Sequence, residues 1–112
     1  MTIKILLVCG GGASTGFLVQ NMRKVAAQKD MEMTIDARSE TQLASILHDV
    51  SVVLAAPHLR FQEAKIKELC SPRGIPYGFI EPMQYGTMDG EAVIQQALEL
   101  LQQEGGENPK SS

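Results

Sequence analysis

The strongest constraint on the fold is a regular alternation of strand-like and helix-like segments along the 112 residues. Strands are predicted where short segments are apolar or alternate apolar with polar residues, and helices where apolar residues recur at helical spacing. The predicted strands cover residues 3–8, 31–37, 50–56 and 76–80. The predicted helices cover residues 17–28, about 40–49, 60–70 and about 90–103, and residues 81–90 are predicted to form a loop.

Several helix ends carry their own signals. Ser39 with Gln42 fits a capping box at the start of the second helix, and Asp89 fits the N-cap position of the last. The sequence Ser-Pro-Arg-Gly at residues 71–74 ends the third helix.

This alternation predicts an α/β fold, a single-domain three-layer sandwich in which helices cover both faces of a parallel sheet. The domain is predicted to span residues 1–103. The tail, residues 104–112, contains no apolar residue and is predicted to be disordered. In such sheets, ligands bind at the carboxyl ends of the strands.

Composition excludes several function classes. The net charge of −3 and the scattered basic residues argue against nucleic acid as a partner. The apolar run at residues 3–8 is too short for a membrane span, so we expect a cytoplasmic protein with reduced thiols. We expect neither a cofactor nor a metal site, and no exposed apolar stripe calls for a dimer, which favours a monomer.

The functional signal is a cysteine followed by a cluster of glycines. Cys9 directly follows the first predicted strand, and four of the ten glycines stand at positions 10, 11, 12 and 16. Small residues let successive backbone N–H groups point into one concavity, and the helix that follows adds its free N–H groups and dipole. Such an anion cradle favours the thiolate of Cys9, which indicates attack on a phosphorus atom.

Other phosphate-binding motifs do not fit this loop. A Walker loop is excluded because Phe17 and Leu18 follow Gly16 in place of Lys and Ser or Thr. Thr15 stands where a dinucleotide fingerprint needs glycine and where a tyrosine-phosphatase-type loop needs arginine. Gly12 excludes a Cys-x-x-Cys redox pair. A thiol that can accept a phosphoryl group but is poorly equipped for hydrolysis suits a phosphocarrier.

Together these residues resemble a known family. The features are Cys9 to Thr15 after a buried strand, an apolar strand ending at Pro57, and the segment Tyr85-Gly86-Thr87-Met88-Asp89-Gly90 before the last helix. This combination resembles the enzyme IIB component of the lactose/cellobiose class of sugar phosphotransferase systems. The resemblance covers residues 1–103. The loop departs from the family at Gly10 and Gly11, where relatives often have Ser and Ala.

The resemblance implies a four-stranded sheet of order 2-1-3-4 and a transferase that carries phosphoryl groups during sugar transport. It implies that Cys9 accepts a phosphoryl group from a histidine of enzyme IIA and passes it to a sugar bound by the membrane enzyme IIC. Docking on IIC would bring the protein transiently to the inner face of the membrane. The implied phosphate contacts are Gly10, Gly11, Gly12, Ala13, Ser14, Thr15 and Gly16.

Several residues outside the glycine-rich loop are candidates for a functional or a packing role. Pro57, His58, Tyr85 and Asp89 are candidates for the rim of the pocket, although loop, turn and capping roles would also explain them. Cys70 is expected to be a packing residue at a helix end.

Two other functions remain open at this point. One is a low-molecular-weight phosphatase or arsenate-reductase-like cysteine hydrolase, which the Thr15 position disfavours. The other is a non-catalytic anion-binding module.

Overall fold

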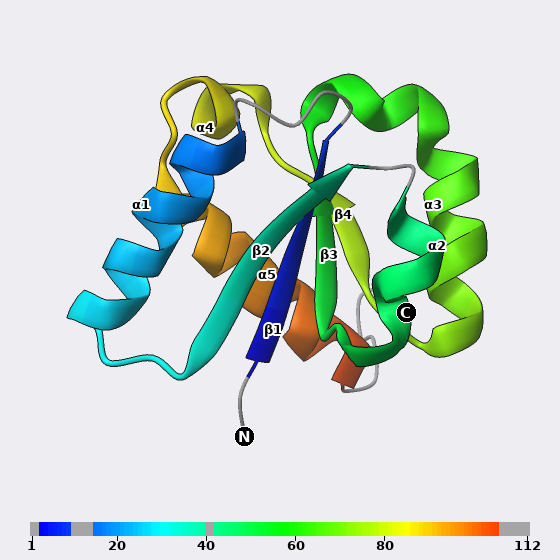
Figure 1. Cartoon of the computed structure of the whole chain (residues 1–112), viewed down its shortest axis with the longest axis horizontal. Coiled ribbons are helices and arrows are strands. Elements are labelled where there is room, and N and C mark those ends of the chain that lie inside the picture. Colours follow the sequence, from blue (N-terminus) through cyan, green and yellow to red (C-terminus); the bar gives the residue numbers. More distant parts are fainter. Residues whose placement is uncertain (1–2, 10–14, 40–41, 106–112) are drawn as a thin grey trace.

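The structure is a computed structural model that describes residues 3–9, 15–39 and 42–105 of the chain. Four parallel strands form one sheet in the order β2-β1-β3-β4 (Figure 1). The strands are β1 (Ile3–Cys9), β2 (Met33–Ser39), β3 (Val52–Ala55) and β4 (Tyr77–Phe79). Both the parallel sheet and the order 2-1-3-4 are confirmed.

Helices cover both faces of the sheet. The long helices α1 (Thr15–Gln28) and α5 (Gly90–Gly105) lie on one face, and α2 (Leu43–Ile46) and α3 (Glu63–Cys70) lie on the other (Figure 1). Shorter turns complete the connections: η2 (Leu47–Asp49), η3 (Pro57–Gln62), η4 (Ser71–Arg73) and α4 (Pro82–Gly86). The predicted three-layer sandwich is therefore confirmed.

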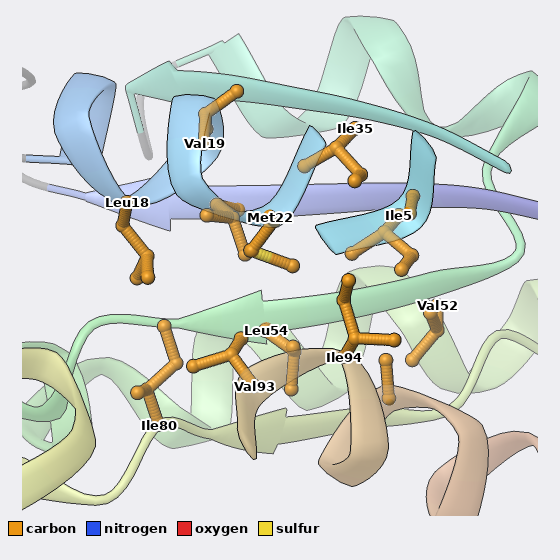
Figure 2. Close-up of a cluster of buried hydrophobic side chains, with 13 residues drawn as sticks. Ile5, Leu18, Val19, Met22, Ile35, Val52, Leu54, Ile80, Val93 and Ile94 are labelled. Carbon is orange, nitrogen blue, oxygen red and sulfur yellow. The ribbon is translucent and has the colours of Figure 1, made fainter. Parts of the chain in front are cut away.

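Each face of the sheet has its own apolar cluster, because successive strand residues point to opposite faces. Ile5 and Leu7 of β1 pack with α1 and α5, together with Met22, Leu54 and Val93 (Figure 2). Leu6 and Val8 instead join a second cluster with residues of α2, η3 and α3. The central strands β1 and β3 are thus buried on both sides, which explains their continuous apolar sequences.

Left-handed residues end two of the helices. Asp30 (φ 57°) follows α1, and the N–H of Met31 donates to the carbonyl of Ala26 at 2.9 Å. Gly74 (φ 68°) follows η4, where the N–H of Ile75 donates to the carbonyl of Cys70 at 3.1 Å. In both cases these bonds satisfy carbonyl groups at the helix end. Helix ends near residue 30 and at residues 71–74 are confirmed.

Several boundaries differ from the prediction, and β3 and β4 are each shorter than predicted. β2 begins and ends two residues later than predicted, at Met33 and Ser39. The third helix is preceded by a 3-10 turn over Pro57–Gln62. A short helix, α4, occupies Pro82–Gly86, where we predicted a loop. Its first residue is proline, whose fixed φ suits the first position of a helix.

The last helix extends two residues beyond its predicted end, to Gly105. Residues 106–112 of the predicted disordered tail lie outside the described residues. Within the described ranges, no helix combines the length and the apolar character needed to cross a membrane.

Candidate functional site

Cys9 is the last residue of β1, at the carboxyl edge of the sheet. On one side it pairs in register with Ser39, the last residue of β2. On the other side Ala56, which follows β3, donates its N–H to the carbonyl of Val8 at 2.9 Å. The thiol therefore lies where the central strand ends between two neighbours, as expected for a binding site in a parallel sheet.

The thiol is held by contacts within the fold. Cys9 is only 2% exposed and belongs to the cluster that contains Leu43 and Leu59. Its Sγ donates to the backbone carbonyl of Arg38 at 3.9 Å, so β2 restrains the side chain. A group held in this way is positioned before any partner arrives.

The predicted phosphate-binding loop is described only at its two ends. Gly10, Gly11, Gly12, Ala13 and Ser14 lie outside the described residues, so their contacts remain a prediction. Thr15 and Gly16 form the first turn of α1, two residues earlier than the predicted helix start. A strand that ends at Cys9 and a helix that begins at Thr15 give the strand–loop–helix order that the sequence predicted.

A cavity of about 460 Å³ lies beside the thiol. Among the described residues it is lined by Cys9, Ala37, Arg38, Ser39 and Gln42. Arg38, Ser39 and Gln42 were not predicted as site residues, because the predicted second strand stopped at residue 37. The strand order 2-1-3-4 could have indicated these residues, because in that order the second strand lies next to the first and its end lies beside Cys9.

Ser39 and Gln42 both line this cavity and precede α2, whose N-cap residue is Gln42. The backbone N–H of Ser39 donates to Oε1 of Gln42 at 3.3 Å, which is one of the two bonds of a capping box. This contact links the end of β2 to the residue that precedes α2.

Pro57, His58 and Tyr85 come from segments that follow β3 and β4 at the same edge. Pro57 begins η3, and the exposed ring of His58 meets the ring of Tyr85 edge to face, with centroids 5.9 Å apart. Tyr85 is half-buried and packs against the cluster that contains Cys9. Their role as the rim of the phosphate pocket remains a prediction.

Asp89 acts as the N-cap of α5. Its Oδ1 accepts a hydrogen bond from the N–H of Ala92 at 3.1 Å, and its carbonyl accepts one from Val93. The capping prediction is therefore confirmed. Asp89 lines a different cavity, which it shares with Asn21 and Lys24 of α1.

We expect Asp89→Ala to lower the free energy of unfolding by about 1 kcal/mol, because it removes the acceptor for an N–H at the start of α5. Phosphoryl acceptance per folded molecule should not change. Urea unfolding and a phosphorylation assay measure the two properties separately. Asp89→Asn should keep most of the stability because asparagine is an equally good cap, and an Asp89→Asn protein as unstable as Asp89→Ala would contradict the capping role.

Cys70, the second cysteine, ends α3 and is completely buried in the second cluster. Burial raises the pKa of its thiol to about 11, and the nearby Arg73 opposes only part of that rise. Cys70 therefore stays a neutral thiol near neutral pH, as expected for a packing residue. Across the described parts of the chain, no group of His, Cys, Asp and Glu side chains could hold a metal ion.

Known proteins share this arrangement. The family of lactose/cellobiose-specific IIB subunits of the PTS system matches residues 4–96. The oligo-beta-mannoside-specific EIIB component of Bacillus subtilis is 31% identical over 98 residues, which cover 88% of this chain and 95% of that protein. The lactose-specific EIICB component of Staphylococcus epidermidis is 28% identical over 102 residues, which cover 89% of this chain and 17% of that longer protein.

A solved structure agrees with these matches. The cellobiose-specific phosphotransferase IIB component from Borrelia burgdorferi has a TM-score of 0.79 and 41% identity, and the similarity covers 93% of this chain and 95% of that one. These similarities support the carrier over the hydrolase interpretation. The chain therefore belongs to the lactose/cellobiose-specific IIB family of the phosphotransferase system, whose members are phosphotransferases that carry phosphoryl groups in sugar uptake.

Proposed function

We propose that Cys9 is the residue that carries the phosphoryl group, taking it from a phospho-histidine of a IIA component and giving it to a sugar bound by a membrane IIC component. The observation that carries this proposal is the position of the thiol. Cys9 ends the central strand β1 beside a cavity of about 460 Å³, immediately before the glycine-rich segment that leads into α1.

The chemistry of the first step follows from this position. The sulfur of Cys9 attacks the phosphorus, and an S–P bond forms as the P–N bond to the partner's imidazole breaks. The imidazole nitrogen keeps the electron pair of that bond, and the thiol proton ends on the imidazole. In the second step a sugar hydroxyl oxygen attacks the phosphorus, the S–P bond breaks, and the hydroxyl proton restores the thiol.

The segment 10–16 is proposed to hold the phosphoryl oxygens while these bonds change. Helix α1 begins at Thr15 and runs for 14 residues, so the positive end of its dipole and its free N–H groups lie next to this segment. Backbone N–H groups at such a position stabilise charge that develops on phosphoryl oxygens. This contribution needs neither a metal nor a cofactor.

Exposed apolar side chains support a docking surface at the same edge. The large exposed hydrophobic residues among those described are Phe17, Phe61 and Met83, which are 67%, 79% and 75% exposed. They belong to α1, η3 and α4, the elements that follow β1, β3 and β4 at the carboxyl edge, at the top of the view in Figure 1. We propose that both partners dock here in turn, with the chain acting as a monomer at the inner face of the membrane.

Replacing Phe61 with alanine should weaken docking of the IIA component. Truncating an aromatic anchor at an interface typically costs more than 1 kcal/mol, so the KM for phospho-IIA should rise about fivefold to tenfold while kcat changes little. Steady-state transfer with the IIA concentration varied measures both quantities. Lys67→Ala, at an exposed position near the far end of α3, is the control and should leave KM unchanged. Equal KM values for the two variants would contradict this docking surface.

The proposed function is tested by labelling. The purified chain is incubated with phosphoenolpyruvate, the general phosphotransferase proteins and its cognate IIA component. Phosphorus NMR should then show a phosphocysteine signal, and peptide mapping should place it on Cys9. Absence of the signal while the IIA component is phosphorylated would overturn the proposal.

A further inference from the structure

We propose that Arg38 binds the phosphoryl group carried by Cys9, supplying from the neighbouring strand the arginine that the loop itself does not contain. This inference rests on the proposed function, because it requires that Cys9 is phosphorylated. Position 15, where a phosphatase-type loop would place its arginine, is Thr15 in this chain.

The strand register places Arg38 beside the end of β1. β2 is the direct neighbour of β1, and Arg38 pairs with Val8 while Ser39 pairs with Cys9. Adjacent strands lie about 4.8 Å apart, so the backbone of Arg38 runs immediately beside that of Cys9. The contact from Sγ of Cys9 to the carbonyl of Arg38, 3.9 Å long, shows how close the two residues are.

Arg38 also shares a cavity with Cys9. Arg38 and Cys9 both line the space of about 460 Å³ at the carboxyl ends of β1 and β2. Its other lining residues in the described part of the chain are uncharged: Ala37, Ser39 and Gln42. Among the described lining residues, Arg38 is therefore the one whose positive charge could stabilise a phosphoryl group on the sulfur.

Arg38 differs from two cations of β1 and α1, Lys4 and Arg23, in the group that it contacts. Lys4 of β1 lies 3.5 Å from a carboxylate oxygen of Asp49, and Arg23 of α1 lies 3.2 Å from one of Asp36. Arg38 is exposed, and its Nη1 donates to the neutral carbonyl of Ala37 at 2.9 Å. A guanidinium has five N–H donors, so this bond leaves capacity for two phosphoryl oxygens after a change of rotamer.

These contacts define what Arg38 would do in the reaction. A guanidinium stays protonated in proteins, so it neither takes nor gives a proton and acts through charge and hydrogen bonds alone. It stabilises the doubly charged phosphocysteine relative to the free thiol. The equilibrium of transfer from phospho-histidine should therefore shift toward the IIB chain.

The test compares Arg38→Gln, Arg38→Lys and a control, Arg73→Gln. Arg73 is an exposed arginine whose Nη1 also donates to a nearby backbone carbonyl, that of Leu69 at 2.8 Å, but it lies in η4, before β4 begins. Each protein is phosphorylated through the cognate IIA component, and phosphorus NMR measures the fraction of phosphocysteine at equilibrium. The phosphorylated chain is then isolated from IIA and its phosphorus shift is titrated with pH.

Arg38→Gln should lower the equilibrium constant for phosphoryl transfer to Cys9 about fivefold to tenfold, since an opposite charge near the phosphoryl group is lost. The second ionisation of its phosphocysteine should move to higher pH, because the dianion loses its cation. Arg38→Lys should recover part of both effects, and Arg73→Gln should match the parent chain. The titration separates phosphoryl binding from docking, since IIA is absent.

The two proposals fail in different ways. If the parent chain gives no phosphocysteine, the proposed function is overturned, and this inference with it. If Cys9 is phosphorylated but Arg38→Gln matches Arg73→Gln in both equilibrium and titration, only the role of Arg38 is overturned. Because Arg38 is exposed, circular dichroism of the variants should match that of the parent chain.

Discussion

Replacing Cys9 with serine should reduce phosphoryl acceptance from phospho-IIA on the order of a thousandfold or more. A serine hydroxyl at the end of β1 keeps the size and position of the side chain but is a far weaker nucleophile than a thiolate. The variant should fold, because the change replaces one atom at an edge of the sheet. Rapid-quench transfer assays with a chromatographic count of phosphorylated protein measure the loss directly.

Cys70→Ala is the matched control for this experiment. Cys70 is a buried thiol whose pKa is raised to about 11, so it remains protonated from acidic pH up to well above neutrality. A protonated thiol is a poor nucleophile, and Cys70 lies at the end of α3, before β4 begins, whereas Cys9 lies at the carboxyl end of β1. We expect Cys70→Ala to accept phosphoryl groups at the rate of the parent chain, with some loss of stability from the cavity that it leaves.

Two results would contradict the assignment of the nucleophile. Retention of transfer in Cys9→Ser would mean that another side chain accepts the phosphoryl group. Loss of transfer in a folded Cys70→Ala protein would mean that the second cysteine participates. The comparison is informative because both thiols belong to the same apolar cluster and differ mainly in position relative to the carboxyl edge.

The general architecture could be predicted because each layer has a periodic sequence. β1 and β3 are buried on both faces and read as continuous apolar runs, and α5 carries a clear apolar stripe. The position of Cys9 followed from the same reasoning, since a strand of this kind must end where its apolar residues end. The strand order came from the family resemblance, because periodicity does not specify which strands are neighbours.

The immediate surroundings of Cys9 could not be predicted in the same way. β2 is an edge strand, and its last residues, Arg38 and Ser39, are polar, so hydrophobic periodicity stopped before the strand did. Backbone pairing with β1 continues to Ser39, and hydrogen bonds of the backbone leave no signature in side-chain pattern. The polar residues that line the cavity could therefore be placed beside Cys9 only from the register in which β2 pairs with β1.

The residues from Tyr85 to Gly90 have several structural roles, which the sequence motif alone did not distinguish. Tyr85 packs beside His58, whereas Asp89 caps α5. Met88 adopts a left-handed conformation (φ 55°), and its carbonyl accepts a hydrogen bond from Nδ2 of Asn21 at 2.9 Å. The second half of the segment thus fastens the start of α5 to α1, which in turn begins at the phosphate-binding segment.

We expect Gly90→Ala to destabilise the protein by about 1–3 kcal/mol, the usual cost of overpacking a buried site. A Cβ on Gly90 would lie 2.8 Å from the backbone carbon of Asn21 and 2.8 Å from the backbone nitrogen of Met22. These atoms belong to the backbone of α1, so rotation of a side chain cannot relieve the contact. Either α1 or α5 must shift, and thermal or urea unfolding measures the cost.

Gly86→Ala is the matched control within the same segment. Gly86 ends α4 and is exposed, and a Cβ there would meet nothing within 4 Å. Alanine has the higher helix propensity and fewer unfolded conformations, so Gly86→Ala should be neutral or up to about 1 kcal/mol more stable. If Gly90→Ala were as stable as Gly86→Ala, the close approach of α5 to α1 would not be the reason for glycine at position 90. If it is less stable, the contact that positions α1 behind Cys9 depends on the absence of a side chain at that residue.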